Sequence, residues 1–307
     1  MELPQLHTFN FTGVLSESKR IILSRYTHFL TFSLLFLPLS FSLIITPTLN
    51  HHLSDQPFTN PHSDHQKHLT SYILYTLIIH IFTLCAICTI TYTTHHAFFN
   101  HPVNFLDTLK SLTFSFFPLA FTAIIAYVLI FLISITFFML IATVLMLLHN
   151  VGFVIDYNSV HFMWFSAIMG AVLIAIVIYF HVEWSLAFVV VVVESKWGFV
   201  ALMRSSYLVK GMRSVSLLVM LYFGVFGAFI VGMCSVNMRF VGFTMLGSFI
   251  LMMFLLRITA ANTVLYNYCK ALHGELAIEV AEGFDYEYLS LNSDDEKVPH
   301  VVSVVAA

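Results

Sequence analysis

The sequence is poor in charged residues. Only 9% of its 307 residues are Asp, Glu, Lys or Arg, whereas soluble domains contain about 25%. Hydrophobic residues make up 59%, and the mean hydropathy is +0.89. So little charge does not cover a water-exposed surface, which excludes a soluble globular protein. The net charge of −3 shows no basic excess, so we expect no nucleic-acid partner.

Cysteine is also scarce, and catalytic signatures are missing. The four cysteines lie in or beside apolar segments, which excludes a disulfide framework. No phosphate-binding loop, zinc-protease or serine-hydrolase motif is found. We therefore predict a protein that is not an enzyme and carries no cofactor. Cys269, just past the last apolar segment, is either an S-palmitoylation site or a packing cysteine.

Long apolar segments are abundant. A membrane-spanning helix needs about 20 apolar residues, and six segments reach that length. We expect an all-α membrane protein with a bundle of six transmembrane helices. The third and fourth segments exceed one perpendicular crossing and are predicted to be single tilted helices that project past the headgroups. Kinks are predicted at Pro38 and Pro118. The six segments are His28–Pro47, Ser71–Thr91, Phe114–Leu148, His161–Val193, Val215–Cys234 and Val241–Tyr266.

The distribution of Lys and Arg predicts the orientation. Ten of these residues fall on the side of the termini and two, Lys67 and Arg239, on the other, while Arg257 lies inside the sixth segment. Positive charge collects on the cytosolic side, so both termini are predicted to be cytosolic, in an endomembrane or the plasma membrane. The predicted organisation is a cytosolic segment (1–27), a six-span domain (28–266) and an acidic, disordered tail (267–307).

An internal repeat is visible in the first and third segments. TFSLLFLPLSF (Thr31–Phe41) and TFSFFPLAF (Thr113–Phe121) share several residues, and a short charged segment precedes each. These charged segments are Ser16–Arg25 and Asn104–Leu112, and Phe199–Gly211 precedes the fifth segment in the same way. We therefore predict three units of interfacial helix, span and return span. An amphipathic interfacial helix of this kind lies in the headgroup plane with its apolar face toward the lipid.

The stretch VVESKWGFVALMRSSYLVKGMR carries the clearest motif. Its spacing resembles the signature of a plant family of multi-pass proteins without assigned function. It is also similar to one in bacterial membrane domains attached to glycerophosphodiester phosphodiesterases. The run Thr263–Glu275 resembles the end of the plant family's last span. The resemblance implies six spans with interfacial helices and carries over no catalytic residue. The motif residues are Glu194, Gly198, Ala201, Ser205, Leu208, Lys210 and Gly211.

Each residue type in this motif has a physical role that can be predicted. Glu194 is expected to cap the N-terminus of the following helix. Gly198 and Ala201 permit close backbone approach, and Gly211 is expected to end the helix in a left-handed turn. Two interpretations stay open, a plain elbow between two spans and a specific lipid-binding site. In either case, basic residues are expected to contact anionic headgroups, namely Lys196, Arg204, Lys210 and Arg213.

Histidines crowd the first extracytosolic loop. Imidazole is a competent ligand for zinc or copper. The loop, however, contains Pro and Asn and shows no fixed ligand spacing, so a flexible polar loop is the other interpretation. The candidate ligands are His51, His52, His62, His65 and His68.

Ionisable and small residues within the spans suggest two further features. His80, His181 and Glu183 are candidates for a polar path, because ionisable groups inside a membrane are often functional. A position at the interface or in helix packing is the other interpretation. Gly224, Ala228 and Gly232 form a small-residue ridge that would pack against the sixth span or another protomer.

Two functions follow as hypotheses. The first is a non-catalytic membrane organiser or accessory subunit, whose partners are membrane lipids and a helix partner or a second copy. The alternative is a transporter or channel for ions or small solutes, with His80, His181 and Glu183 lining its path.

Overall fold

The computed structural model describes residues 10–54, 63–101, 103–152, 159–236 and 241–275. These residues are mostly helical, and no strand is found among them. The elements are α1 (Phe11–Ser24), α2 (Tyr26–Ser33), the 3₁₀ turn η1 (Leu34–Phe36), α3 (Leu37–Ser54), α4 (Ser63–Phe98), α5 (Phe105–Asn150), α6 (Val160–Glu183), α7 (Ala187–Glu194), α8 (Phe199–Val209), α9 (Arg213–Val236) and α10 (Val241–Leu272).

Six helical stretches are long and apolar enough to cross a membrane. The predicted fold class, an all-α membrane protein with six spans, is therefore confirmed. The spans are Tyr26–Thr46, Thr70–Phe98, Phe105–Asn150, Val160–Glu194, Arg213–Cys234 and Gly242–Leu272.

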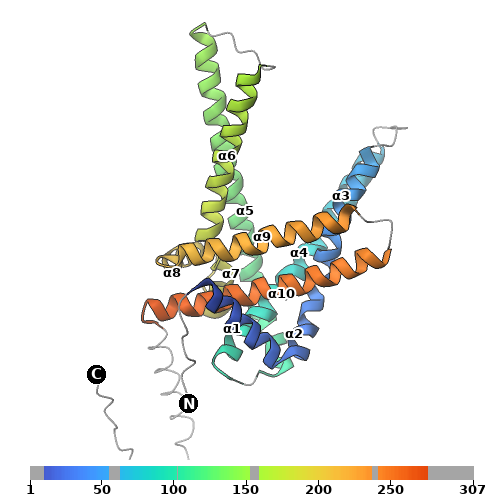
Figure 1. Ribbon diagram of the computed structural model, residues 1–307, viewed down its shortest axis with the longest axis vertical. Coiled ribbons are helices and arrows are strands. Elements are labelled where there is room, and N and C mark those ends of the chain that lie inside the picture. Colours follow the sequence, from blue (N-terminus) through green and yellow to red (C-terminus); the bar gives the residue numbers. More distant parts are fainter. Residues whose placement is uncertain (1–9, 55–62, 102, 153–158, 237–240, 276–307) are drawn as a thin grey trace, which may run out of the picture.

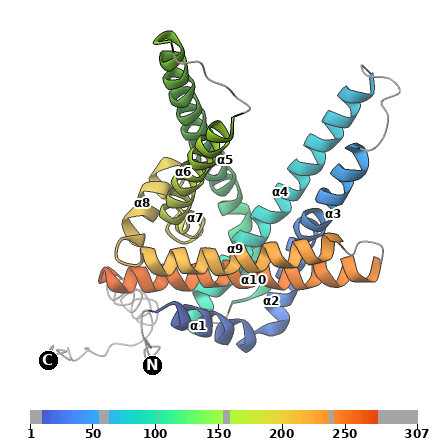
Figure 2. The same ribbon diagram turned by 45° about the horizontal axis from the view of Figure 1, so that its top comes forward.

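The spans form three helical hairpins, α3–α4, α5–α6 and α9–α10, which rise from a shared base (Figure 1). The base consists of α1 and α8 together with α2 and α7, which are the base ends of the first and fourth spans. The hairpins leave it in different directions, and the α5–α6 hairpin diverges clearly from α9–α10 in both views (Figures 1 and 2). The central helix is α10, which contacts α1, α3, α4 and α9.

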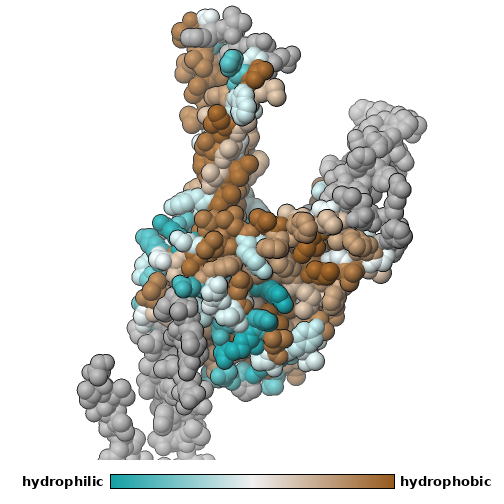
Figure 3. Space-filling view, in the orientation of Figure 1, coloured by the Kyte–Doolittle hydropathy of each residue, from teal (hydrophilic) through white to brown (hydrophobic). Residues whose placement is uncertain are grey.

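On the face shown in Figure 3, the α5–α6 hairpin and α9 present mainly apolar side chains, and polar side chains gather near the base. Exposed Phe131, Phe138 and Met146 on α5 are examples, with Trp164 on α6. Such side chains face lipid tails at no hydrophobic cost, because the tails are as apolar as the side chains themselves. These exposed apolar side chains are therefore suited to contact with lipid tails.

The length of α5 agrees with the splayed arrangement. At about 1.5 Å per residue its 46 residues span about 69 Å, more than twice the ~30 Å hydrocarbon core. Even at a tilt of about 40° a helix of that length exceeds the hydrocarbon core, so part of α5 extends past it. The prediction of a single continuous third span is confirmed. Pro118 lies inside α5 without interrupting it, and the Thr122 hydroxyl donates to the Pro118 carbonyl at 2.7 Å.

The fourth span differs from its prediction as one tilted helix. It breaks into α6 and α7, with a turn at residues 184–186. The broken helix is stable because a side chain from α8 binds the backbone at the turn, as described below. Near Pro38, by contrast, the predicted irregularity is present, since the 3₁₀ turn η1 directly precedes α3. Pro38 has no N–H to donate to a carbonyl in the preceding turn.

The three predicted interfacial helices have different outcomes. α1 and α8 are separate helices, but the segment Asn104–Leu112 is not, because α5 starts at Phe105 and continues without a break. The prediction for the second unit is therefore wrong. Residues 105–117 contain neither Gly nor Pro, so nothing ends the helix there. The buried face of α1, which includes Val14, Ile21 and Ile22, packs in a protein core that α10 shares.

Candidate functional site at the elbow between the fourth and fifth spans

The elbow is defined here as residues 184–212, which comprise α7, α8 and their turns. Its first fixed point is Ser205 on α8, which is fully buried. The Ser205 hydroxyl donates to the Glu183 carbonyl at 2.7 Å and accepts the Leu186 N–H at 3.2 Å. Unpaired backbone groups are costly when buried. Ser205 therefore stabilises the break between α6 and α7 by pairing groups on both sides of it.

The second fixed point is Gly198, directly before α8. Its φ of +68° is a conformation that side chains rarely adopt. Its N–H donates to the Thr122 hydroxyl of α5 at 2.8 Å. A Cβ at this position would lie 3.2 Å from Phe121 Cε1 and 3.3 Å from Ile125 Cδ1. The predicted close approach is therefore present, and the helix approached is α5.

The end of α8 matches its prediction in the same way. Gly211 has a φ of +96°, and a Cβ there would lie 3.1 Å from Leu272 Cδ2 of α10. Ala201 and Leu208 are fully buried on the inner face of α8. The spacing of the motif thus gives α8 one apolar face that packs into the protein and a glycine turn at its end.

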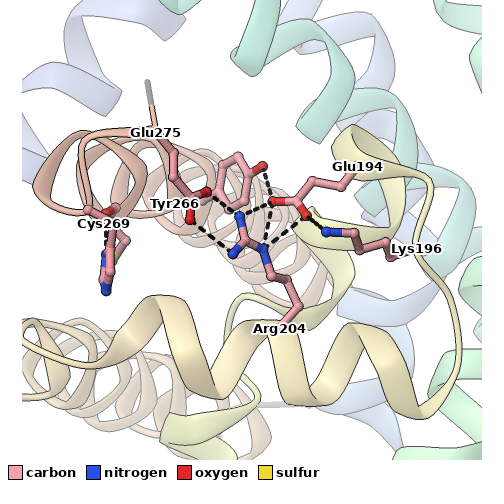
Figure 4. Close-up of polar contacts among 7 residues, drawn as sticks. Glu194, Lys196, Arg204, Tyr266, Cys269 and Glu275 are labelled. Atoms are coloured by element: carbon pink, nitrogen blue, oxygen red, sulfur yellow. Dashed lines mark hydrogen bonds and ion pairs between the residues drawn. The ribbon is translucent and has the colours of Figure 1, made fainter. Parts of the chain in front are cut away.

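Arg204 and Glu194 form the centre of a polar network (Figure 4). Arg204 donates to Glu194 through Nε at 3.0 Å and through Nη2 at 3.2 Å. Both terminal nitrogens of Arg204 also donate to Glu275, Nη1 at 3.1 Å. Glu194 further accepts the Tyr266 hydroxyl at 2.9 Å and Lys196 Nζ at 2.8 Å. The network thus joins α7, α8 and the C-terminal end of α10.

The predicted role of Glu194 as a helix cap is wrong. α8 begins at the N-cap Gly198, and no side chain of the described residues caps it by a hydrogen bond. The guanidinium of Arg204 is the stronger partner, because a carboxylate and Arg form charge-assisted hydrogen bonds with two donors.

The ion pairs of the network stabilise the charged forms of Arg204 and Glu275. The hydrogen bonds that Arg204 donates to Glu275, together with those to Glu194, raise the pKa of Arg204 above its ordinary value. Hydrogen bonds from Arg204 lower the pKa of Glu275 below its ordinary value. The Arg204 side chain is only 19% exposed. Arg204 is therefore a permanently charged link between two carboxylates.

Three of the four basic residues predicted to contact headgroups bind protein carboxylates, and their contact with headgroups stays a prediction. Arg204 and Lys196 bind Glu194, and Arg213 Nε lies 2.7 Å from Glu183 Oε1. Lys210 is exposed, so its headgroup contact stays a prediction. At the elbow, Arg204 joins α8 to α7 and to Glu275, and Arg213 joins the start of α9 to the end of α6.

The structure does not bring the three path candidates together. His80 on α4 lines a cavity of about 560 Å³ between α3, α4, α5 and α7, and neither His181 nor Glu183 lines it. His181 is exposed on α6. Glu183 is buried, with 5% of its surface exposed, and is paired with Arg213. A shared polar path through these three residues is therefore not present in this structure.

The small-residue ridge of α9 does not pack against α10. Gly224, Ala228 and Gly232 are all exposed, and a Cβ at either glycine would have no neighbour within 4 Å. Gly227 faces α10 instead, because a Cβ added at Gly227 would lie 3.6 Å from Phe254 Cε1. The prediction of packing against the sixth span is wrong, because the ridge lies on the other side of the helix. Packing against another protomer stays a prediction.

Cys269 is not a lipidation site in this fold. Its side chain is fully buried in the main hydrophobic core, at the C-terminal end of α10. A thiol without exposed surface does not meet an acyl donor, so the packing interpretation holds and the S-palmitoylation prediction is wrong.

The histidine-rich loop falls outside what the structure describes. By the bounds of the helices, His51 and His52 belong to the end of α3, and His65 and His68 to the start of α4. His62 and the side chains of all five lie outside the described residues. No group of three potential metal ligands occurs among the residues that are described, and the metal interpretation of the loop is untested.

Sequence reasoning did not predict the partners from α10. Tyr266 and Glu275 both belong to the run Thr263–Glu275, whose resemblance to the plant family gave it weight. The signal was therefore present, because two distant motifs of one family are candidates for contact. Asn267 was also missed. It is fully buried, and its Oδ1 lies 3.1 Å from His95 Nδ1 of α4.

One protein family matches nearly the whole chain. The sequence model described as "Domain of unknown function (DUF8558)" matches residues 1–298. No curated protein and no solved structure matches. The resemblance to the bacterial membrane domains therefore stays a prediction, and the functional argument has to come from the molecule itself.

Proposed function

The chain belongs to this family of unknown function, and we propose that it is a non-catalytic organiser or accessory subunit of a membrane. It acts through contacts with lipids and with partner helices or a second copy. Both termini face the cytosol, in an endomembrane or the plasma membrane. The distribution of Lys and Arg supports this orientation. So does the base of the molecule, where α1, α8 and the C-terminal end of α10 lie away from the far ends of the hairpins (Figure 1).

The main support for this proposal is that His80, His181 and Glu183 do not line one shared cavity. A solute path would need its polar groups along one cavity. His80 lines a cavity without the other two candidates, and Glu183 is neutralised by Arg213 at the elbow. At the elbow, Arg204 is likewise paired with Glu194 and Glu275. Glu183, Glu194 and Arg204 therefore stabilise helix contacts, while exposed apolar side chains on the hairpins are suited to lipid.

Cysteine accessibility distinguishes this function from transport, which is the alternative because His80 does line a cavity. Single cysteines at positions 80, 181 and 183 are placed in a chain without native cysteines. They are then treated with a charged, membrane-impermeant thiol reagent from either side. We expect position 80 to be unreactive from both sides. Lys210→Cys is the matched control and should react from the cytosolic side only, because Lys210 is exposed on the elbow.

The transport alternative gives a different pattern. It requires positions 80, 181 and 183 to react, with access from opposite sides and protection by one solute. That pattern would overturn the organiser proposal. If Lys210→Cys reacts only from the extracytosolic side, the orientation is wrong, whatever the outcome at the other positions.

A further inference from the structure

A cavity of about 560 Å³ is lined mainly by residues of α3 and α4, and Tyr127 of α5 and Phe188 of α7 complete it. We call it the His80 cavity. Its volume is within the range of about 300–1,000 Å³ that small-molecule sites occupy. Tyr72 and Tyr75 of α4 line it and are about half exposed, so the cavity opens toward the surroundings of the protein. An occupant therefore has room to enter from the bilayer.

The cavity contains an imidazole without a hydrogen-bond partner. His80 lies inside the span Thr70–Phe98, and its ring is 5.6 Å from that of Tyr127 between centroids. None of the described residues forms a hydrogen bond with it. A neutral imidazole has one donor and one acceptor, and polar groups that face hydrocarbon without partners cost free energy. A ligand hydroxyl can pair with either ring nitrogen, because it accepts from the N–H or donates to the other nitrogen.

Threonine hydroxyls surround this position. Thr76 and Thr83 donate to backbone carbonyls of α4 at 2.8 Å, and Thr46 donates to a carbonyl of α3 at 2.7 Å. Their donors are therefore used. The oxygen lone pairs of Thr76 and Thr83 remain available to accept from a ligand, whereas Thr46 already accepts from the Ser42 hydroxyl at 3.4 Å and keeps one lone pair. The cavity thus offers acceptors on both walls, at the level where α3 and α4 face each other.

No Asp, Glu, Lys or Arg lines the His80 cavity. A phosphate headgroup or a fatty-acid carboxylate would find no opposite charge there, and burying such a charge is costly. The remaining walls are apolar, with Leu39 and Leu43 on α3, Ile87 on α4 and Phe188 on α7. They suit a hydrocarbon or ring body. The lining therefore selects a molecule that is apolar and uncharged and carries a hydroxyl.

We propose that the His80 cavity binds a neutral lipid that carries a hydroxyl group, with this hydroxyl hydrogen-bonded to His80 and the adjacent threonines. Sterols and diacylglycerols share this chemistry. The inference rests on the proposed function and makes it more specific, since it names the lipid that the protein engages.

The test uses photoreactive lipids with the full-length protein in phosphatidylcholine nanodiscs. Three probes are compared, a photoreactive sterol, a photoreactive diacylglycerol and a photoreactive phosphatidylcholine, and the labelled peptides are identified by mass spectrometry. We expect at least one hydroxyl probe to label peptides of α3 and α4, and the unlabelled lipid to compete. The phosphatidylcholine probe should label the exposed hairpin surfaces without preference for these peptides.

Substitutions then test the role of the imidazole. His80→Leu should reduce this labelling about fivefold, the effect of one lost hydrogen bond. His181→Leu is the matched control and should leave it unchanged, because His181 lies outside the cavity. Should His80→Leu fail to fold, Thr83→Val takes its place, with a reduction expected again.

Two results would overturn the inference. One is equal labelling of α3 and α4 by the phosphatidylcholine probe, and the other is unchanged labelling of a folded His80→Leu or Thr83→Val variant. Either result leaves the organiser proposal standing, because that proposal fails only when position 80 is accessible to water together with 181 and 183.

Discussion

Replacement of Arg204 by Met is the sharpest test of the elbow. Met has similar length and no charge, so it removes the hydrogen bonds to Glu194 and Glu275 and leaves the apolar packing of the stem. Glu194, whose side chain is only 9% exposed, would keep Lys196 and Tyr266 as partners. Removing one partner of a fully buried ion pair costs about 3–5 kcal/mol. Because Arg204 is 19% exposed and Glu194 keeps two partners, we expect about 2–3 kcal/mol.

The assay is thermal unfolding of the detergent-solubilised protein, with Lys210→Met as the control. Lys210 is exposed, and an exposed substitution changes the free energy of unfolding by no more than about 0.5 kcal/mol. The unfolding temperature should therefore fall clearly for Arg204→Met and hardly at all for Lys210→Met.

A second substitution shows whether the loss comes from the charge pair. Glu194→Gln in the Arg204→Met background removes the carboxylate that has lost its guanidinium. The double variant should lose less stability than the sum of the two single variants, because residues in one network are coupled. Equal unfolding temperatures for Arg204→Met and Lys210→Met would refute the network. Strict additivity would refute the direct coupling of Arg204 to Glu194.

Three other predictions test the fold and its orientation. Gly247→Ala should destabilise the α9–α10 hairpin by about 1–3 kcal/mol, because the new Cβ would clash with Cys234 Sγ. Gly224→Ala is the control: its Cβ would meet nothing within 4 Å, so the variant should be neutral or stabilising in the same thermal assay. Glu275 has a lowered pKa in the folded protein, so it stabilises above its unfolded pKa of about 4.3 and loses this contribution as the pH falls through the lowered value; Glu275→Gln should flatten the decrease of unfolding temperature in that range. A glycosylation tag inserted into the loop 51–68 should be modified in cells and one in the C-terminal tail should not, and the reverse pattern would contradict the orientation.

The helices could be predicted from the sequence because membrane spans depend on length and composition alone. α5 is a partial example, since the apolar segment Phe114–Leu148 forms one helix as predicted, but this helix begins at Phe105 and includes the segment predicted to be a separate interfacial helix. The break of the fourth span could not be predicted, because it depends on Ser205, which lies 19 residues beyond Leu186 in the sequence. Local patterns do not show that a distant hydroxyl will pair the backbone groups of a turn.

The elbow illustrates which part of a site can be predicted. Gly198 and Gly211 were expected to hold close approaches and a left-handed turn, and both do, because glycine has few other reasons to stand at such positions. The partner of Glu194 was predicted wrongly. A carboxylate at a helix end fits a capping role locally, but Arg204 and Tyr266 reach it only through the packing of α8 and α10.

The elbow and the His80 cavity share one element, α7. Its N-terminal end is held by the bond of Leu186 N–H to Ser205, and its last residue, Glu194, is held by Arg204. Phe188, between these fixed points, forms a wall of the His80 cavity. The elbow therefore positions one side of the proposed lipid site although it contributes no polar group to it.

This connection gives a final prediction. Arg204→Met releases one end of α7 and should reduce labelling of the α3 and α4 peptides by the hydroxyl-bearing lipid probe, at a temperature where the variant is still folded. Lys210→Met should not. A folded Arg204→Met variant with a lowered unfolding temperature and full labelling would mean that α7 keeps its place without the ion pair. The elbow would then serve only to join the spans, and the His80 cavity would depend on α3, α4 and α5 alone.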